Sequence, residues 1–233
     1  MPAVSGEIPL LPLPTVLFPG TFLPLQITDE SQRAMLRACV DEGNSLGVVL
    51  TSDDDLHAKS AIPYTTGCLA SVALLAYEND DFSDEPISVV LYGEHRIRII
   101  EYVQQDPYLT GQVESFKDYD GLNVERRAQQ TSQRFDQYLD IVREYYSADV
   151  INFSLPSDPT LASYVLASVL YLPLSIKQRW LESPSTAYRL EQELAYLQAE
   201  CEKHEVLLSL SRQMHRRYSF PDPQLYLSLT SNN

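Results

Sequence analysis

Residues 7–27 decide the fold, and they read Glu-Ile-Pro-Leu-Leu-Pro-Leu-Pro-Thr-Val-Leu-Phe-Pro-Gly-Thr-Phe-Leu-Pro-Leu-Gln-Ile. Five prolines interrupt this apolar stretch. Because proline has no N–H and fixes φ, the stretch is neither a helix nor a central strand throughout. The sequence predicts two short extended segments, Ile8–Leu13 and Thr21–Ile27, joined by an apolar bend at Pro14–Gly20. In this bend Pro19 presets φ, and Gly20 can take a positive φ.

The apolar side chains of this stretch are expected inside the protein. Exposed together they would form a large solvated apolar patch, which monomeric soluble proteins rarely carry. We therefore expect most of the following residues to be buried: Leu11, Leu13, Val16, Leu17, Phe18 and Leu25.

The composition of the whole chain is that of an ordinary globular protein. Its 233 residues are 44% hydrophobic and 21% charged, and no apolar run reaches the roughly 18 residues of a membrane span. The first residues lack the basic and apolar regions of a secretory signal. The three cysteines, Cys39, Cys68 and Cys201, are odd in number and far apart, which favours reduced, buried thiols over disulfides. These features predict a cytoplasmic protein.

The net charge of −15 is concentrated in the first half of the chain. Residues 1–121 hold 19 acidic and 6 basic side chains, whereas residues 122–233 hold 13 acidic and 11 basic side chains. Nucleic-acid binding depends on Lys and Arg, which neutralise phosphate charge. The balance therefore argues against a nucleic-acid partner and is easier to reconcile with basic or unfolded polypeptide.

Beyond the opening stretch, the pattern of apolar residues predicts strands first and helices afterwards. Asp29 is the expected N-cap of a helix that runs to Glu42 and ends at Gly43, with its apolar face made by Ala34, Leu36, Ala38, Cys39 and Val40. Further strands are expected at 46–50, 64–77, 87–92 and 108–116. The strand at 87–92 is expected to continue past Gly93 into 96–103, with a bulge or bend at this glycine.

Helices are expected at 122–146, from Asp158-Pro159 to about 170, from a Ser175 cap to 181, and at 186–218. The last helix repeats apolar residues every three or four positions, and we expect this face to pack against the preceding helices rather than form a free coiled coil. The fold class is α+β, with a β domain at 1–118 and a helical domain at 119–233 that ends in a long helix and an extended tail.

The chain resembles the Lon protease amino-terminal domain family in several ordered motifs. The start resembles the family's pattern at Leu11-Pro12-Leu13, Phe18-Pro19-Gly20 and Pro24-Leu25. Later matches cover the strand that opens at Gly67, the strand with Gly93 and Arg96, and the Pro107-Tyr108 step, where Gly111 replaces the usual Ala. In the helical half the matching residues are Leu172-Pro173-Leu174, Lys177-Gln178, Leu181-Glu182 and Arg189-Leu190.

This resemblance implies a PUA-like, six-stranded pseudo-barrel followed by an α-helical bundle. In full-length members this region recognises substrates ahead of an ATPase and a peptidase. The sequence contains no Gly-x-x-x-x-Gly-Lys-Ser/Thr motif for binding nucleotide phosphates, so we expect a standalone, non-enzymatic form. The family-motif positions expected to have structural roles are Pro12, Phe18, Pro19, Gly20, Pro24, Gly67, Gly93, Arg96 and Pro107.

Residues with catalytic or metal-binding chemistry do not form a recognisable site in the sequence. The four histidines share no metal-ligand spacing with each other or with the cysteines, so no metal, cofactor or catalytic residue is predicted. The acidic clusters at 53–55 and 78–85 lack the Ca²⁺-loop pattern and are interpreted as solvated loops. His95 is expected to be exposed on its strand, and Arg96 is expected to pair with a carboxylate of the barrel.

The resulting hypothesis is a protein that binds unfolded or exposed apolar polypeptide segments, in quality control or as an adaptor to proteolysis. The expected site is a groove between the β domain and the helical domain, with a protease or chaperone as a further partner. The chain is expected to be a monomer or a weak homodimer. Tyrosine suits contacts that are wet at one end and apolar at the other, and the candidate contact residues are Tyr64, Tyr77, Tyr92 and Tyr108. The alternatives are an RNA-binding protein, by analogy with other PUA-like folds, and a cryptic hydrolase.

Overall fold

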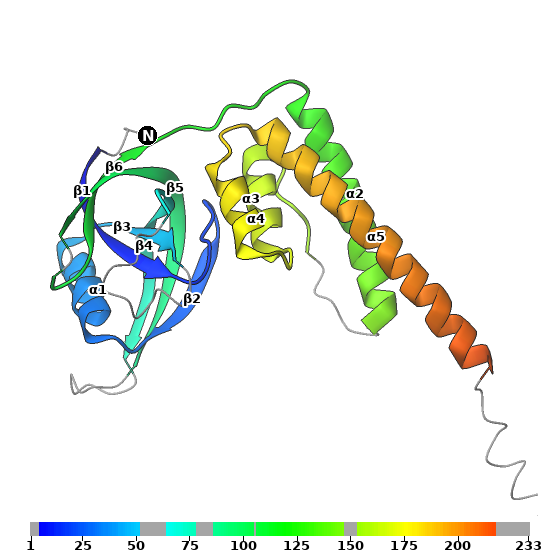
Figure 1. Ribbon diagram of the computed structural model, residues 1–233, viewed down its shortest axis with the longest axis horizontal. Coiled ribbons are helices and arrows are strands. Elements are labelled where there is room, and N and C mark those ends of the chain that lie inside the picture. The colour runs from blue at the N-terminus through cyan, green and yellow to red at the C-terminus, as the bar shows by residue number, and fades with distance from the viewer. Residues whose placement is uncertain (1–4, 52–63, 78–85, 105, 147–152, 218–233) are drawn as a thin grey trace, which may run out of the picture. The chain divides into compact units, whose positions relative to one another are not determined.

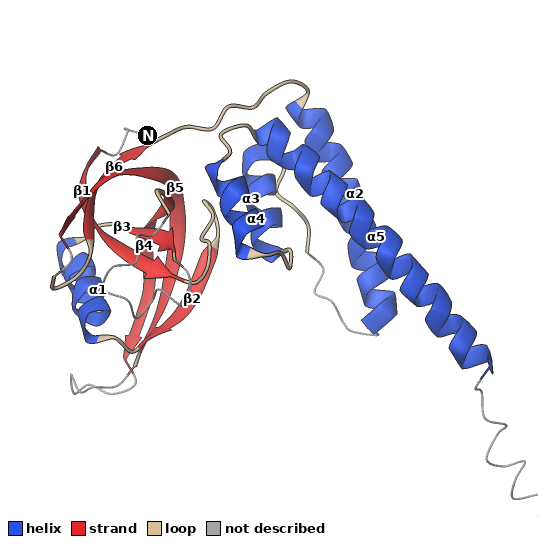
Figure 2. Cartoon of the chain, in the orientation of Figure 1, coloured by secondary structure: helices blue, strands red, loops and turns tan. Residues whose placement is uncertain are grey.

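A computed structural model describes residues 5–51, 64–77, 86–104, 106–146 and 153–217. The chain divides into two compact units, Met1–Ala128 with Leu155–Glu193 and Gln129–Ser154 with Leu194–Asn233. All described strands belong to the first unit, whereas the described secondary structure of the second is helical (Figure 2). Within the described ranges, no helix has the length and apolar character required to span a membrane.

Six strands form one closed sheet in the first unit (Figure 1). They are β1 (Ser5–Leu13), β2 (Phe22–Ile27), β3 (Leu46–Leu50), β4 (Thr66–Tyr77), β5 (Ile87–Gln104) and β6 (Thr110–Ser115). Their order is β2-β5-β4-β3-β1-β6, and a further pairing of β5 with β6 closes the barrel. Only β1 and β3 run parallel among the paired strands. The expected six-stranded pseudo-barrel is confirmed.

The long strand β5 takes part in three pairings, with β2 along its first part, with β6 along its last part and with β4 throughout most of its length. The sequence predicted that 96–103 continues the strand at 87–92 past Gly93, and the structure confirms this, because β5 is continuous through Gly93. Irregularities in the register with β4 and β6 let the one strand change partners without a break.

The bend that was expected after β1 is the point at which the opening stretch meets β5. The Gly20 N–H donates to the Gly93 carbonyl at 2.7 Å, and the Gly93 N–H donates to the Thr21 carbonyl at 2.9 Å. A Cβ atom on Gly93 would lie 2.3 Å from the Phe18 carbonyl oxygen, so only glycine fits. Gly20 has φ +75°, which confirms the expected positive φ.

The opening stretch supplies much of the barrel core. Phe18 and Leu13 are buried, and so are Leu11, Val16 and Leu17, as expected, while Leu25 is only partly buried. The helix α1 (Glu30–Glu42) begins at the Asp29 cap and ends at Gly43. Its buried residues include Met35, Leu36 and Cys39, whereas Ala34 and Val40 are exposed. The predicted apolar face of this helix was therefore wrong, because the buried face is rotated from it by part of a turn.

The remaining helices are α2 (Val124–Tyr146), α3 (Pro159–Val169), α4 (Leu174–Glu182) and α5 (Thr186–Arg217). The Asp158 carboxylate accepts a hydrogen bond from the Leu161 N–H at 2.7 Å, which confirms the expected start of α3. The Ser175 cap was wrong, because α4 already begins at Leu174 after Pro173, which fixes φ but offers no capping side chain.

The second unit contains residues of α2 and α5, and both helices also contribute residues to the first unit. Phe135 of α2 is buried, as are Leu197, Cys201 and His204 on one side of α5. The His204 ring stands edge-on to the Tyr138 ring, with 6.0 Å between the ring centroids. The side of α5 that the sequence marked as apolar is therefore packed within this unit.

Candidate functional site

The outward side of β2, β5 and β4 presents an apolar face in the first unit. Phe22 of β2 lies beside Tyr92 of β5, which in turn pairs with Ser71 of β4. The next outward row is Pro24, Val90 and Leu74. Successive residues of a strand point to opposite sides, so the alternate residues Leu23, Leu25 and Ile27 face the core. We call Phe22, Pro24, Leu74, Val90 and Tyr92 the outer face.

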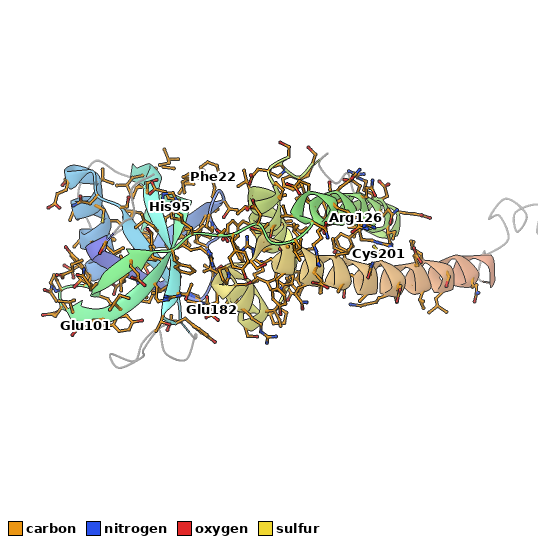
Figure 3. All side chains as sticks on the ribbon, turned by 90° about the horizontal axis from the view of Figure 1, so that it is seen from above. Phe22, His95, Glu101, Arg126, Glu182 and Cys201 are labelled. Atoms are coloured by element: carbon orange, nitrogen blue, oxygen red, sulfur yellow. The ribbon has the colours of Figure 1, made fainter. Side chains whose placement is uncertain are left out.

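Several outer-face side chains are solvated although they are apolar. Phe22 is 65% exposed, Leu74 is 59% exposed and Tyr92 is 36% exposed. The Phe22 and Tyr92 rings contact each other, with their centroids 5.0 Å apart. Figure 3 labels Phe22 on the barrel. A contiguous apolar patch of this kind marks a binding surface more often than a scatter of single exposed residues does.

A shallow hollow lies on the outer face. It has a volume of about 320 Å³ and is lined by Pro24, Leu25, Gln26, Leu74, Ser88, Val89 and Val90. A second hollow, of about 300 Å³, lies in the second unit, and its lining includes Asp136, Asp140 and Arg143. The Arg143 and Asp140 side chains pair with each other at 2.8 Å, so charged groups share the lining of this second hollow with Leu139 and Phe153. The lining of the outer-face hollow contains no charged residue, which suits it better to apolar side chains.

The four candidate tyrosines do not form one cluster. Tyr92 belongs to the outer face, whereas the Tyr64 carbonyl accepts a hydrogen bond from Tyr102 near the far end of β5. Tyr108 is partly buried against the barrel core. Tyr77 ends β4 opposite Ile87, but its side chain lies outside the described residues. Tyr64 and Tyr92 are both exposed, and of the described tyrosine side chains among the four candidates, that of Tyr92 lies on the outer face.

A buried polar network occupies the interior of the same unit, and Asp118 is at its centre. The Asp118 carboxylate accepts hydrogen bonds from Arg189 at 2.6 Å and from the Tyr164 hydroxyl at 2.7 Å. It also pairs with Arg96 at 3.1 Å. Both arginine side chains are fully buried. Ion pairs of this kind contribute large effects when one partner is removed, because the other charge is left buried and unpaired.

Arg96 connects the barrel to the end of α4. Its Nη1 donates to the carbonyls of Leu181 and Ser183 at 3.1 and 3.0 Å. The guanidinium also lies over the Phe116 ring, 4.1 Å from the centroid. Burial lowers the pKa of Arg96, while the charge of Asp118 opposes this shift. The expected pairing of Arg96 with a carboxylate is present, and that carboxylate lies in the segment after β6.

Arg189, Ser163 and Glu193 continue the network among the helices. The Arg189 Nε donates to the Ser163 hydroxyl at 3.1 Å, and this hydroxyl donates to the Glu193 carboxylate at 2.8 Å. Burial raises the pKa of Glu193 to about 8. This Ser and this Glu are both completely buried, so no substrate could reach them, and the pair offers no hydrolase site.

Elsewhere in the described ranges, reactive side chains are inert or dispersed. Burial raises the pKa of Cys39 to about 11 and also raises the pKa values of Cys68 and Cys201, which makes these thiols poor nucleophiles. Among the described residues, no three potential ligands from His, Cys, Asp and Glu gather around a common point. His95, which was expected to be exposed, is half-buried. The clusters at 53–55 and 78–85 lie outside the described residues.

Comparison with known proteins identifies the family. The family described as "ATP-dependent protease La (LON) substrate-binding domain" matches residues 7–199. The chain belongs to this family. It is also 28% identical over 218 residues to the Lon protease of Anaeromyxobacter dehalogenans, a match that covers 91% of this chain and 25% of that protein. The chain therefore spans about a quarter of the length of this Lon protease.

Two solved structures have the same fold as this LON substrate-binding domain. The crystal structure of the Lon N-terminal domain protein from Xanthomonas campestris matches with a TM-score of 0.59 at 22% identity. The N-terminal domain of the Mycobacterium avium complex Lon protease matches with a TM-score of 0.64 at 17% identity. Each match covers 82% of this chain and 98% of the other chain. The α+β, PUA-like architecture is thereby confirmed.

The family-motif residues of this LON domain take up different positions. Phe18 and Pro19 are buried in the bend, and Gly67 lies where a Cβ would meet the Val48 carbonyl oxygen at 2.4 Å. Pro12 is half-buried in β1, and Pro107 is exposed after a cis peptide bond. Pro24 is exposed on the outer face.

Sequence reasoning missed two groups of residues. Asp118, Ser163, Tyr164 and Glu193 of the network carried no local motif, although Arg189 and Gln178 did fall on the helical motif. The Gln178 amide donates to the Thr66 carbonyl at 2.9 Å, a second link between α4 and the barrel. The outer face had one signal, because apolar residues occupy both alternating phases of β2.

Proposed function

We propose that this LON substrate-binding domain binds exposed apolar segments of unfolded polypeptide at its outer face. The observation that carries the proposal is the solvated apolar row of Phe22, Tyr92 and Leu74 with the hollow beside it. The name of the family supports a substrate-binding role, and the substrates of a protease are polypeptides. The outer face contains no Lys or Arg, so nothing on this surface favours RNA.

The proposed binding is non-covalent and weak. Burying a few apolar side chains on this face would release water from both surfaces, and part of that gain is lost in ordering the bound segment. We expect a dissociation constant on the order of 1–100 μM, which suits brief capture of many different sequences. The domain would thus present a client for proteolysis without carrying out chemistry itself. The three buried, unpaired cysteines fit a reducing compartment, and we propose the cytoplasm.

Binding to a permanently unfolded protein tests this function. Isothermal titration calorimetry would compare a reduced, carboxymethylated globular protein with the same protein in its folded form. We expect binding of the unfolded form only. Absence of binding to any unfolded polypeptide would overturn the proposal.

Paired variants locate the surface in the same assay. Phe22→Ser combined with Leu74→Ser removes two exposed apolar side chains from the outer face and should abolish measurable binding. Val206→Ser combined with Leu210→Ser removes two exposed apolar side chains from α5 and is the matched control. An equal loss in both pairs would show that general surface hydrophobicity, and not the outer face, causes binding.

A further inference from the structure

The strand β2 has an open backbone edge beside the outer face. Among the described strands it pairs with β5 alone. The Gly93 N–H donates to the Thr21 carbonyl, while the Gly93 carbonyl accepts from Gly20, so the Thr21 carbonyl occupies a hydrogen-bonded position of the ladder just before β2. Hydrogen-bonded and non-hydrogen-bonded pairs alternate along an antiparallel ladder. The C=O groups of Phe22, Pro24 and Gln26 therefore point away from β5, and so do the N–H groups of Phe22 and Gln26.

Pro24 occupies a position that fits this assignment. It has no N–H, so it can pair with Val90 without loss only where its nitrogen faces the open edge. The edge then offers two N–H donors, from Phe22 and Gln26, and three carbonyl acceptors. No described residue forms a hydrogen bond with these groups.

The two ends of this edge differ in charge. At the Phe22 end the neighbouring side chains are apolar, including Tyr92. At the Ile27 end the chain continues into Asp29 and Glu30, which are exposed.

We propose that β2 captures a client by strand addition, with the client as an extended segment antiparallel to β2. Antiparallel pairing is slightly more stable for each residue than parallel pairing. In this orientation the amino-terminal end of the client lies beside Ile27 and Asp29. The favoured client therefore has Lys or Arg first, followed by a segment with apolar residues at alternate positions that lie on the outer face. This inference rests on the proposed function and adds the mode of binding and the client class.

Peptides with modified backbones test strand addition. The probe is a short peptide of two lysines followed by alternating valine and serine, titrated by fluorescence anisotropy. Two versions carry N-methyl groups on alternate backbone nitrogens, one version on the valines and the other on the serines. Because the valines fix the phase on the outer face, only one version should lose the hydrogen bonds to β2. We expect that version to bind about tenfold more weakly, while the other keeps its affinity.

The outcomes separate the two proposals. If both methylated versions bind as the parent does, or if both lose affinity equally, strand addition is overturned while binding at the outer face stands. If no peptide binds and unfolded proteins do not bind either, the proposed function itself fails. On the protein side, Gln26→Pro removes one outward donor and should weaken the parent peptide about fivefold. An unchanged unfolding midpoint would show that this variant keeps its fold.

Charge order is tested with a reversed peptide in which the lysines follow the apolar segment. We expect it to bind several-fold more weakly than the parent at low salt, and we expect the difference to disappear at high salt. Asp29→Asn removes the charge but keeps a residue that caps helices well, so α1 should remain stable. This variant should reduce the difference between the two peptides. Equal binding of both peptides to the wild-type protein would contradict the proposed orientation.

Discussion

The interior and the surface of the first unit distribute polarity in opposite ways. Where the helices of this unit meet the barrel, two buried arginines share one carboxylate, Asp118. On the outer face, Phe22 and Leu74 are left in water. Burying charge is costly unless every partner is present, so loss of one member of the network should weaken the packing of the helices on the barrel. Apolar exposure has no such structural role, and this difference separates the residues that hold the fold from those proposed to bind a client.

The largest effect should come from the interior. Arg189→Met would leave Asp118 without its shortest ion pair and should lower the free energy of unfolding by about 3–5 kcal/mol. Urea denaturation measures this change. Arg127→Met is the control, since Arg127 pairs with Glu191 at 2.7 Å on a partly exposed surface and should cost about 0–1 kcal/mol. Equal losses of unfolding free energy in the two variants would contradict the claim that the buried network is more important for stability than a partly exposed ion pair.

Glu193 should give the interior a characteristic pH dependence. Its pKa is about 8 in the folded protein, above the ordinary 4.5, because it is buried. Between about pH 4.5 and pH 8, the folded state therefore keeps a proton on Glu193 that the unfolded state releases. The contribution of this carboxyl to the free energy of unfolding is then fully present below about pH 4.5. It is lost as the pH rises through 8, and the loss is on the order of a few kcal/mol. Glu193→Gln should remove this fall, which denaturation at pH 5 and pH 9 would reveal.

Glu191→Gln is the matched control for this pH series. Glu191 lies on the same helix and is more than half exposed, so its neutralisation should leave the pH profile of the wild type in place. A Glu193→Gln variant with the same pH profile as the wild type would show that the Glu193 carboxyl does not hold the proton.

The outer face should show the opposite response. Phe22→Ser should weaken binding of an unfolded polypeptide about tenfold, which corresponds to about 1.4 kcal/mol. It should change the free energy of unfolding by no more than about 0.5 kcal/mol, because the ring is already solvated. Calorimetric titration and urea denaturation of the same preparation measure both quantities. A large loss of stability would mean that Phe22 belongs to the fold rather than to the binding surface.

The smallest effect should come from Arg98, which lies two residues from Arg96 on β5. Both guanidiniums approach the Phe116 ring, at 4.1 Å for Arg96 and 4.9 Å for Arg98. Arg98 is half exposed and pairs with Glu114 at 3.4 Å, so Arg98→Met should cost about 0–0.5 kcal/mol. Thermal unfolding of Arg98→Met beside Arg96→Met measures the difference. Similar losses would show that stacking on Phe116, and not burial in the network, makes Arg96 important.

The sequence predicted what depends on local chemistry. Asp29 and Asp158 cap their helices, Gly20 takes a positive φ, and the proline-rich opening divides into β1 and β2. The start of α4 was missed because Pro173 supplies no capping side chain. The buried network was beyond sequence reasoning for a different reason. Asp118 and Arg189 are distant in the chain, and a pairing between distant residues leaves no mark in either local pattern.

The candidate site shows the same limit. Tyr64, Tyr92 and Tyr108 have the same amphipathic chemistry, and only the barrel's curvature and register decide which of them is exposed on an apolar surface. Leu74 reaches the outer face because the register between β4 and β5 shifts between Val72 and Leu74. A strict alternation along β4, read from the sequence, could not have placed it there.

The central claim is that polypeptide binds at the outer face of β2, β5 and β4. Two-dimensional NMR of the amide-labelled protein, titrated with an unfolded polypeptide, tests it most directly. The account predicts that perturbed amides concentrate at residues 22–26, 71–76 and 88–92, and that the surroundings of Arg96 and Asp118 stay unchanged. Perturbations that concentrate on α5, or that spread evenly over the protein, would contradict it.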